Sequence, residues 1–231
     1  MMKSLVTADG GLTTAGYAVS VIAVLLLIAA VVFLCRKNSS NVKMTTQQLV
    51  TCAAALALAF IASYIRIFKL PFGGSVTLFS MLFIALIGYW YGPKVGIITG
   101  LVYGILQFLQ EPYVLSLFQV CCDYIFAFGA MGLSGLFSKS KKHGLLKAYI
   151  IAILARGAFH ALGGYLYWMD YMPENFPQSL AALYPIIYNY GYILLEGVLT
   201  VIVISIPAVS KALTQIRTVT TPAGKLSPAS K

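Results

Sequence analysis

Polar, cationic and aromatic side chains interrupt two otherwise apolar segments in the second half of the chain. Arg156, His160 and Trp168 are separated by four and eight residues. At about 100° per residue they lie on one side of a helix, with His160 and Trp168 about 12 Å apart along its axis. Asn189 and Glu196, seven residues apart, share a face of the next segment. Polar groups within a bilayer are costly and face a bundle interior or a cavity, so the spacing predicts a buried polar pocket between two helices.

Asp123 places a carboxylate inside a further apolar segment, with Gln119 and Tyr124 close by. A carboxylate neutralises an organic cation, and the faces of aromatic rings attract the same charge. His160 and Asn189 offer hydrogen bonds to a heterocycle. The aromatic members of this set are Tyr103, Tyr113, Trp168, Tyr184 and Tyr188. Together these residues predict a site for a cationic, heterocyclic ligand, although Arg156 and Glu196 could also form a purely structural ion pair.

Motifs for other kinds of chemistry are absent from the sequence. There is no GxxxxGK[ST] phosphate loop, no HExxH, no GxSxG and no paired His/Asp metal motif. The cysteines Cys35, Cys52, Cys121 and Cys122 lack CxxC spacing and are expected to be small core residues. We therefore expect no metal and no cofactor, and a membrane-embedded enzyme would have to use Asp123, His160 or Glu196 without a recognisable triad.

The composition is that of an integral membrane protein. Of 231 residues 60% are hydrophobic and only 10% are charged, and the mean hydropathy is +0.87. Apolar runs bounded by Gly, Pro and charged residues predict an all-α bundle of seven helices. The expected helices cover residues 17–34, 46–68, 76–91, 95–109, 115–137, 148–168 and 184–207, and residues 211–231 are expected to form a disordered basic tail.

Charge is distributed unevenly between the two ends of this bundle. One set of loops and the C-terminal tail carry Arg36, Lys37, Lys43, Lys94, Lys139, Lys141, Lys142, Lys147, Lys211, Arg217, Lys225 and Lys231. The opposite set carries Lys3, Arg66 and Lys69 together with the acids Asp9, Glu111, Asp170 and Glu174. By the positive-inside rule the N-terminus is expected outside and the C-terminus in the cytoplasm. This distribution accounts for the net charge of +10 without nucleic acid as a partner.

Five stretches in the same order give the chain a resemblance to a known family. They are PFGGSVTLFSM (71–81), YGPKVGIITGLVYGILQ (91–107), PYVLSLFQVCCDYIFAFGAMGLSGLF (112–137), ARGAFHALGGYLYW (155–168) and YPIIYNYGYILLE (184–196). Over residues 46–217 the chain resembles the thiamine-specific substrate-binding subunits, or S-components, of energy-coupling-factor (ECF) vitamin transporters. The resemblance implies a six-helix domain at residues 45–210. Residues 1–44, with the helix at 17–34, are an addition to the family's fold.

The resemblance also implies a binding site and partners. A thiamine pocket would contain Asp123, Tyr124, Trp168, His160, Asn189, Tyr184, Tyr113 and Tyr103. Tyr103 stands where some members have Trp, and the sequence GGSVTLFSM lacks a Trp and a Glu that some members carry. Ala53 and Ala57 form an AxxxA pair of the kind that lets helices approach closely, and they match the surface that docks on the coupling subunit.

The function implied is uptake of thiamine across the bacterial cell membrane. The subunit would capture thiamine from outside and deliver it through a membrane coupling subunit and two ATPase subunits, which would supply the ATP chemistry that this chain lacks. Two alternatives keep the membrane bundle: an S-component for another vitamin or precursor, and an embedded enzyme. A purely structural membrane protein accounts poorly for so many polar groups on inward faces.

Overall fold

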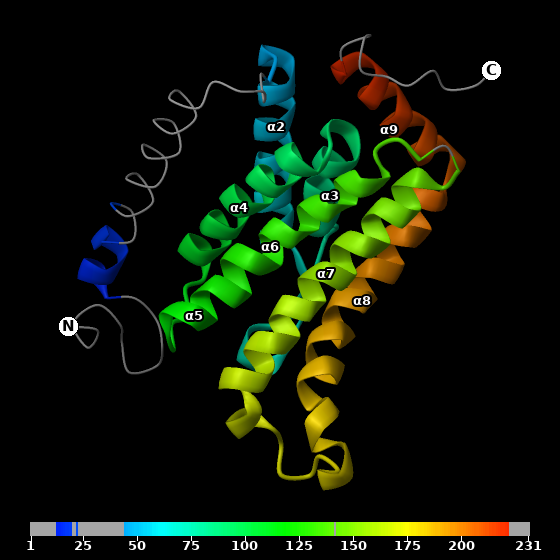
Figure 1. The fold of residues 1–231 in the computed structure, drawn as a ribbon. Coiled ribbons are helices and arrows are strands. Elements are labelled where there is room, and N and C mark those ends of the chain that lie inside the picture. Colours follow the sequence, from blue (N-terminus) through cyan, green and yellow to red (C-terminus); the bar gives the residue numbers. More distant parts are fainter. Residues whose placement is uncertain (1–12, 20–21, 23–43, 141, 222–231) are drawn as a thin grey trace.

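The structure is a computed structural model that describes residues 13–19, 22, 44–140 and 142–221 (Figure 1). Of the predicted helix at residues 17–34, only residues 17–19 and 22 belong to this part, and they are helical. The remainder of that predicted helix lies outside the described residues.

Helices form the body of the molecule, in the order α2 (Thr46–Tyr64), α3 (Ser80–Tyr91), α4 (Pro93–Gln110), a composite helix, α7 (Gly144–Tyr167) and α8 (Tyr184–Ser205). The composite helix runs through α5 (Leu117–Val120), η3 (Cys121–Phe126), α6 (Ala127–Ala130) and η4 (Met131–Phe137). Within the described residues four helical segments are long and apolar enough to cross a membrane: Thr46–Tyr64, Leu117–Phe137, Gly144–Tyr167 and Gln178–Ser205. The chain is thus a mostly helical, multi-pass membrane protein.

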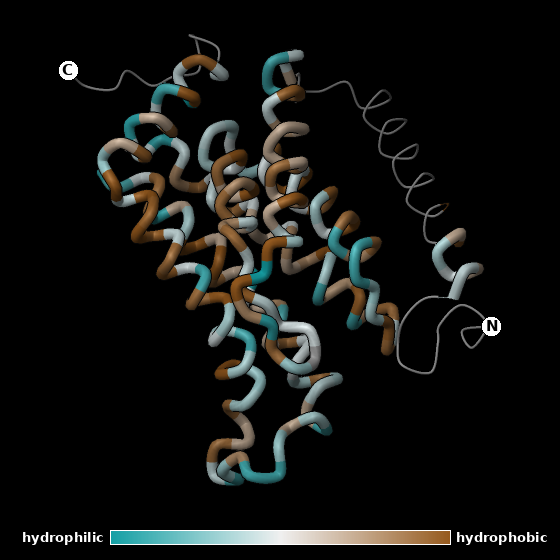
Figure 2. The backbone as a smooth tube through the Cα atoms, turned by 180° about the vertical axis from the view of Figure 1, so that it is seen from behind, coloured by the Kyte–Doolittle hydropathy of each residue, from teal (hydrophilic) through white to brown (hydrophobic). Residues whose placement is uncertain are grey.

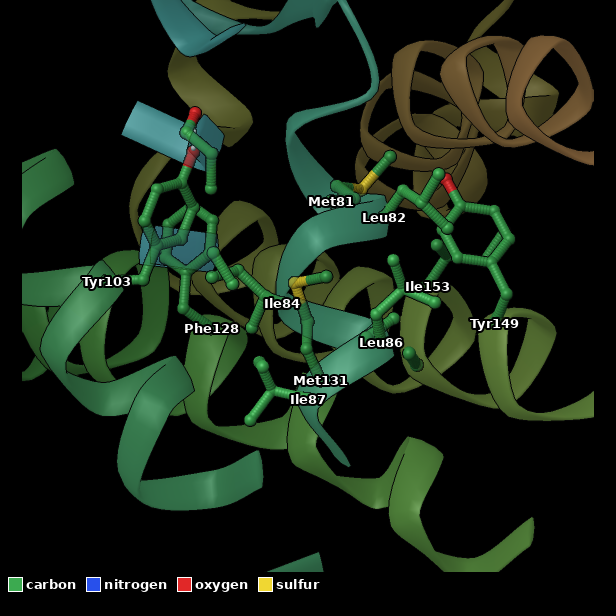
Figure 3. Packing of buried hydrophobic residues seen from close by; sticks show 14 of the residues in the cluster. Met81, Leu82, Ile84, Leu86, Ile87, Tyr103, Phe128, Met131, Tyr149 and Ile153 are labelled. Atoms are coloured by element: carbon green, nitrogen blue, oxygen red, sulfur yellow. Dashed lines mark hydrogen bonds between the residues drawn. The ribbon is translucent and has the colours of Figure 1, made fainter. Parts of the chain in front are cut away.

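The centre of the bundle is α3, which packs against α2, α4, α7 and η4. Met81, Ile84 and Ile87 of α3 are completely buried, and Figure 3 shows them among Met131, Ile153 and other side chains of the neighbouring helices. On α4, glycines at 96, 100 and 104 follow one another at every fourth position and face the composite helix. A Cβ at Gly100 would lie 2.2 Å from the Phe128 carbonyl oxygen, so this close approach of two helices requires glycine.

A two-stranded antiparallel hairpin corrects the prediction of an all-α fold. Strand β1 (Arg66–Lys69) pairs with β2 (Ser75–Thr77) through the short helix η2 (Pro71–Gly73). The helices predicted at residues 46–68 and 76–91 each overlap one of these strands. Instead α2 ends at Tyr64, because Ile65 adopts extended backbone (φ −86°, ψ 91°) and its carbonyl accepts from the amide of Leu78 across the hairpin. Pro71 and Gly73, which has a φ of +104°, form the turn between the strands.

The other correction concerns the C-terminal tail, where residues 211–221 had been expected to be disordered. Helix α9 (Pro207–Thr220) follows α8 directly and crosses the predicted boundary between residues 210 and 211. Figure 2 shows hydrophilic residues in the α7–α8 connection at one end of the molecule and along α9 at the other. The α7–α8 connection contains η5 (Met169–Tyr171) and η6 (Gln178–Leu183).

Candidate ligand-binding site

A cavity of about 400 Å³ lies between the composite helix, α7, α8 and the β1–β2 hairpin. It brings together seven of the eight residues that the sequence predicts for the pocket: Asp123, Tyr124, Trp168, His160, Asn189, Tyr184 and Tyr113. Arg156 and Tyr188 also line it. Residues from four separate parts of the sequence thus meet in one polar and aromatic cavity inside an apolar bundle.

The carboxylate of Asp123 lies on the wall of this cavity. It belongs to η3, a short π-helical segment, and such segments within α-helices are frequent at functional sites. Its Oδ2 accepts a hydrogen bond of 2.7 Å from Nε2 of Gln119, and its Oδ1 lies 3.3 Å from Nδ1 of His160. The side chain is 16% exposed. A carboxylate held by two neighbours and open on one side is positioned to receive a cation.

The hydrogen-bond network assigns a neutral tautomer to His160. Nε of Arg156 donates to Nε2 of His160 at 3.3 Å, so this ring nitrogen accepts. The ring proton is then on Nδ1, where it can be donated to Asp123. The Arg156 guanidinium lies 4.6 Å from the ring centre of Phe128. The ion pairs found among the described residues do not include one between Arg156 and Glu196, so the structural pair considered from sequence is not formed.

Three aromatic rings form one wall of the cavity. The ring centre of Trp168 lies 4.9 Å from Tyr113, at an interplanar angle of 34°, and 5.2 Å from Tyr171. The hydroxyls of Tyr113 and Tyr171 are 3.4 Å apart. Tyr171 was missed from the sequence because it lies in the connection after α7, where helical spacing gives no guide. This wall offers ring faces to a flat or cationic ligand.

Polar groups of α8 form another part of the cavity lining. Tyr192 donates to Oδ1 of Asn189 at 3.2 Å, and Nδ2 of Asn189 donates to the Pro185 carbonyl at 2.8 Å. Tyr188 donates to the carbonyl of Pro71, which links α8 to the hairpin. Tyr192 lines the cavity and was also missed, although its position three residues after Asn189 puts it on the same helical face.

Charged side chains lie at the hairpin side of the cavity. Glu111 accepts from Lys69 at 2.7 Å and from Arg66, and all three residues line the cavity. Burial raises the pKa of the Glu111 carboxyl, but Lys69 and Arg66 outweigh this and hold the pKa below its ordinary value. This cluster ties strand β1 to the connection after α4.

Tyr103 is the predicted pocket residue that the structure does not bring to the cavity. It is 1% exposed, its hydroxyl donates to the Ala59 carbonyl at 3.2 Å, and its ring packs edge-on against Phe128 at 5.0 Å (Figure 3). Tyr103 therefore joins α4 to α2 within the core. Spacing on α4 could not separate these two roles, because a pocket wall and a core face can be adjacent on one helix.

Glu196 is likewise outside the cavity lining. It is 2% exposed and accepts from the Thr77 amide at 2.8 Å, from the Thr77 hydroxyl at 2.7 Å and from the Met81 amide at 3.3 Å. It thus joins α8 to the end of β2 and to the first turn of α3.

Ala53 and Ala57, predicted to dock on a partner, are exposed on α2. Among the described residues no group of three or more His, Cys, Asp or Glu could hold a metal ion.

Comparison with known proteins identifies the family. The family model described as "Thiamine transporter protein (Thia_YuaJ)" matches residues 49–216. The thiamine transporter ThiT of Bacillus subtilis (strain 168) is 30% identical over 170 residues, which cover 66% of this chain and 83% of that protein. A solved structure of ThiT from Listeria monocytogenes is similar with a TM-score of 0.58 at 26% identity, covering 74% of this chain and 96% of that one. These are transporters, which sets aside the embedded enzyme. The predicted resemblance is confirmed, and the chain belongs to the thiamine transporter protein family.

Proposed function

We propose that this chain is the thiamine-binding S-component of an ECF-type importer. The observation that carries the proposal is the cavity in which the Asp123 carboxylate faces the same space as the aromatic wall of Trp168, Tyr113 and Tyr171. Thiamine combines a fixed thiazolium charge with a flat aminopyrimidine ring. A cavity with one carboxylate and several ring faces is chemically matched to both halves.

The proposed roles follow from the groups available in the cavity. Asp123 compensates the thiazolium charge, and Trp168 and Tyr113 stack on the rings. Asn189 and His160 supply directional hydrogen bonds to the pyrimidine, while Tyr124 and Tyr184 contribute to the walls. Gln119 holds the Asp123 carboxylate in place through its 2.7 Å hydrogen bond. Tyr103 acts as a core residue beside this site.

The wider mechanism is also a proposal. Thiamine enters from outside, and the loaded subunit docks on a membrane coupling subunit through the α2 surface around Ala53 and Ala57, with two ATPase subunits supplying the energy. The exposure of both alanines supports this, since a docking surface must be open in the isolated subunit. The concentration of basic residues at the opposite end from the cavity supports a cytoplasmic C-terminus. The six-helix domain comprises α2, α3, α4, the composite helix, α7 and α8, with the predicted helix at residues 17–34 as an extra membrane anchor.

The test is thiamine binding to the purified full chain in detergent, followed by quenching of tryptophan fluorescence. The chain contains two tryptophans, Trp90 and Trp168. Trp168 lines the cavity, whereas Trp90 is 8% exposed in α3 and belongs to the core cluster. We expect saturable, stoichiometric quenching that is retained in Trp90→Phe and lost in Trp168→Phe.

A competition series tests the ligand itself. Unlabelled thiamine, its phosphates and its pyrimidine half are added against bound thiamine, and thiamine is expected to compete best. Absence of thiamine binding by a monodisperse, helical preparation would contradict the proposal and would favour a related vitamin or precursor. Quenching that persists in Trp168→Phe would contradict the placement of the ligand beside that ring.

A further inference from the structure

Helix α9 begins where the last membrane-spanning segment ends. That segment runs to Ser205, Ile206 is extended with φ −65° and ψ 123°, and Pro207 opens α9. Proline is well suited to the first turn of a helix, so the direction of the chain changes sharply at this point. Figure 1 shows α9 folding back from the end of α8 towards α2. The helix thus lies at the end of the bundle, at the level where the chain leaves the membrane.

Contacts with the bundle fix how α9 is rotated about its own axis. The side chains of Gln47 and Tyr91 donate to carbonyls of its last turn, at 2.6 and 3.3 Å. Arg217 donates to the Ser138 carbonyl, and its guanidinium lies 4.5 Å from the ring centre of Tyr89. A helix anchored from three other elements presents a defined surface to its surroundings.

The residues of α9 fall on three faces. Partly buried positions facing the bundle are Val209, Leu213, Arg217 and Thr220. An exposed apolar flank, which we call the α9 apolar flank, contains Ala208, Ala212, Ile216 and Val219, and its centre lies about 100° from the inward face. An exposed polar flank, about 120° away on the other side, contains Ser210, Lys211, Thr214 and Thr218.

Exposed apolar residues are found both on the α9 apolar flank and on the membrane-spanning helix before it. Val219 is 71% exposed and Ile216 is 45% exposed, and on α8 and at its end Ile202 and Ile206 are 58% and 46% exposed. Exposed apolar residues on a spanning helix face lipid. A helix that follows such a span and has one exposed apolar flank and one exposed polar flank shows the pattern of helices that lie at the boundary between headgroups and acyl chains.

Charge at this end of the molecule favours anionic lipid. After Glu196 the sequence contains Lys211, Arg217, Lys225 and Lys231 and no acidic residue. The neighbouring connection between the composite helix and α7, SKSKKHGLLK, is also basic and lacks acids. Basic residues next to a membrane surface are attracted to anionic headgroups.

We propose that α9 is an interfacial helix whose apolar flank inserts into the lipid leaflet at this end of the bundle, with anionic phospholipid beside Lys211 on its polar flank. This places α9 as a lateral support for the first turn of α2, to which it is joined through Gln47. The proposal does not depend on the ligand of the cavity.

The experiment places one tryptophan reporter on each flank of α9. Val219→Trp and Thr214→Trp, about 140° apart, are made separately in the full chain carrying Trp90→Phe and Trp168→Phe. Each protein is reconstituted into vesicles of phosphatidylcholine alone or with one third phosphatidylglycerol. Quenching by lipids brominated near the top of the acyl chain is compared with quenching by aqueous iodide. If the chain carrying Trp90→Phe and Trp168→Phe is unstable, the same two reporters are placed in the chain that keeps both native tryptophans. Their emission is then obtained as the difference from the spectrum of that parent chain.

We expect lipid quenching and a blue-shifted emission for the reporter at 219, and iodide quenching for the reporter at 214. The lipid quenching at 219 should increase severalfold with phosphatidylglycerol, and Lys211→Gln should reduce that increase. Equal access of iodide to both reporters overturns the proposal, as does shielding at 219 that appears only with a bound coupling subunit. Lipid quenching at 219 that is unchanged by phosphatidylglycerol overturns the role assigned to anionic lipid.

Discussion

At the scale of single residues, the Asp123 carboxylate carries the chemistry of the cavity. Gln119 and His160 hold its two oxygens, and the neutral tautomer of His160 means that the imidazole does not cancel the negative charge. Arg156 is the nearest fixed cation in this chain of hydrogen bonds, but it contacts His160 and the Phe128 ring. The carboxylate therefore keeps the capacity to compensate a cationic ligand.

Replacing Asp123 with Asn tests this role. The substitution removes the charge while keeping the size and most of the hydrogen-bonding capacity of the side chain. Leaving a bound cation without its partner in a partly buried site should cost about 3 kcal/mol, or roughly a hundredfold in the Kd for thiamine. The affinity for the neutral pyrimidine half of thiamine should fall far less. That affinity is measured by competition against bound thiamine in the wild type and by direct titration in Asp123→Asn. Equal losses for the charged and neutral ligands would count against charge compensation.

Residue types and helical spacing went far towards predicting the cavity. Asp123, His160 and Asn189 were predicted together because ionisable and amide groups in apolar helices must face inwards. Tyr103 obeys the same rule yet packs in the core, because burial alone does not separate a cavity wall from a packed interface. Tyr171 could not be predicted from spacing, since its place beside Trp168 depends on the path of the connection after α7.

At the scale of elements, the position of Asp123 depends on how closely the composite helix approaches α7. Gly163 provides this approach, because a Cβ at that position would lie 2.8 Å from Oδ1 of Asp123. The neighbouring Gly164 does the same against α8, where a Cβ would lie 2.8 Å from the Cβ of Pro185. Consecutive glycines thus let one helix contact two others at the level of the cavity.

Gly163→Ala should displace the Asp123 carboxylate from its position beside His160. We expect thiamine affinity to fall by about tenfold, which is about 1.4 kcal/mol, while the protein remains folded. Gly191→Ala is the matched control, because it adds the same methyl group to a helix with nothing within 4 Å. Titration by Trp168 fluorescence measures both variants. A control variant that loses as much affinity would show that helix propensity, rather than the approach to Asp123, causes the effect.

The hairpin was one of the two elements that sequence patterns missed, the other being α9. Apolar residues on both sides of residues 70–74 favoured helices, whereas the chain forms strands closed by η2 and tied to the rest of the molecule through side chains. Glu196 binds the end of β2, and Glu111 binds Lys69 and Arg66 on β1. These ties are between residues distant in sequence, so local propensity could not predict them.

The Glu111 cluster gives the hairpin a dependence on pH. The pKa of this carboxyl in the folded protein is below its ordinary value of 4.5, so its stabilising contribution is present above that value and is lost as the pH falls through the lowered pKa. Because Glu111 is 50% exposed, the contribution is expected to be below about 1 kcal/mol. Wild type and Glu111→Gln should differ slightly in melting temperature at pH 7 and converge as the pH falls below the lowered pKa of Glu111. A difference that stays constant throughout the acid titration would indicate that the carboxylate charge is not its source.

At the scale of the whole molecule, hydropathy predicted a multi-pass bundle and the order of its helices, because a bilayer requires long apolar segments with satisfied backbones. The same criterion missed α9, whose alternation of apolar and polar faces suits the membrane surface rather than its interior. Surface features carry weaker signals in sequence than spans do. The exposed α2 surface around Ala53 and Ala57 is such a feature, since the docking role proposed for it would appear only in contact with another subunit.

Enlarging these alanines should separate binding from transport. Ala53→Leu and Ala57→Leu add three carbons each on an exposed surface, so thiamine binding by the isolated chain should be unchanged within about twofold, or roughly 0.4 kcal/mol. Uptake of labelled thiamine by cells that depend on this subunit should fall at least tenfold, because larger side chains prevent the close approach of helices that small residues permit. Leu58→Phe adds three carbons about 120° around α2 and should leave uptake intact. Normal uptake with both leucines present would remove α2 from the docking surface and leave the cavity assignment untouched.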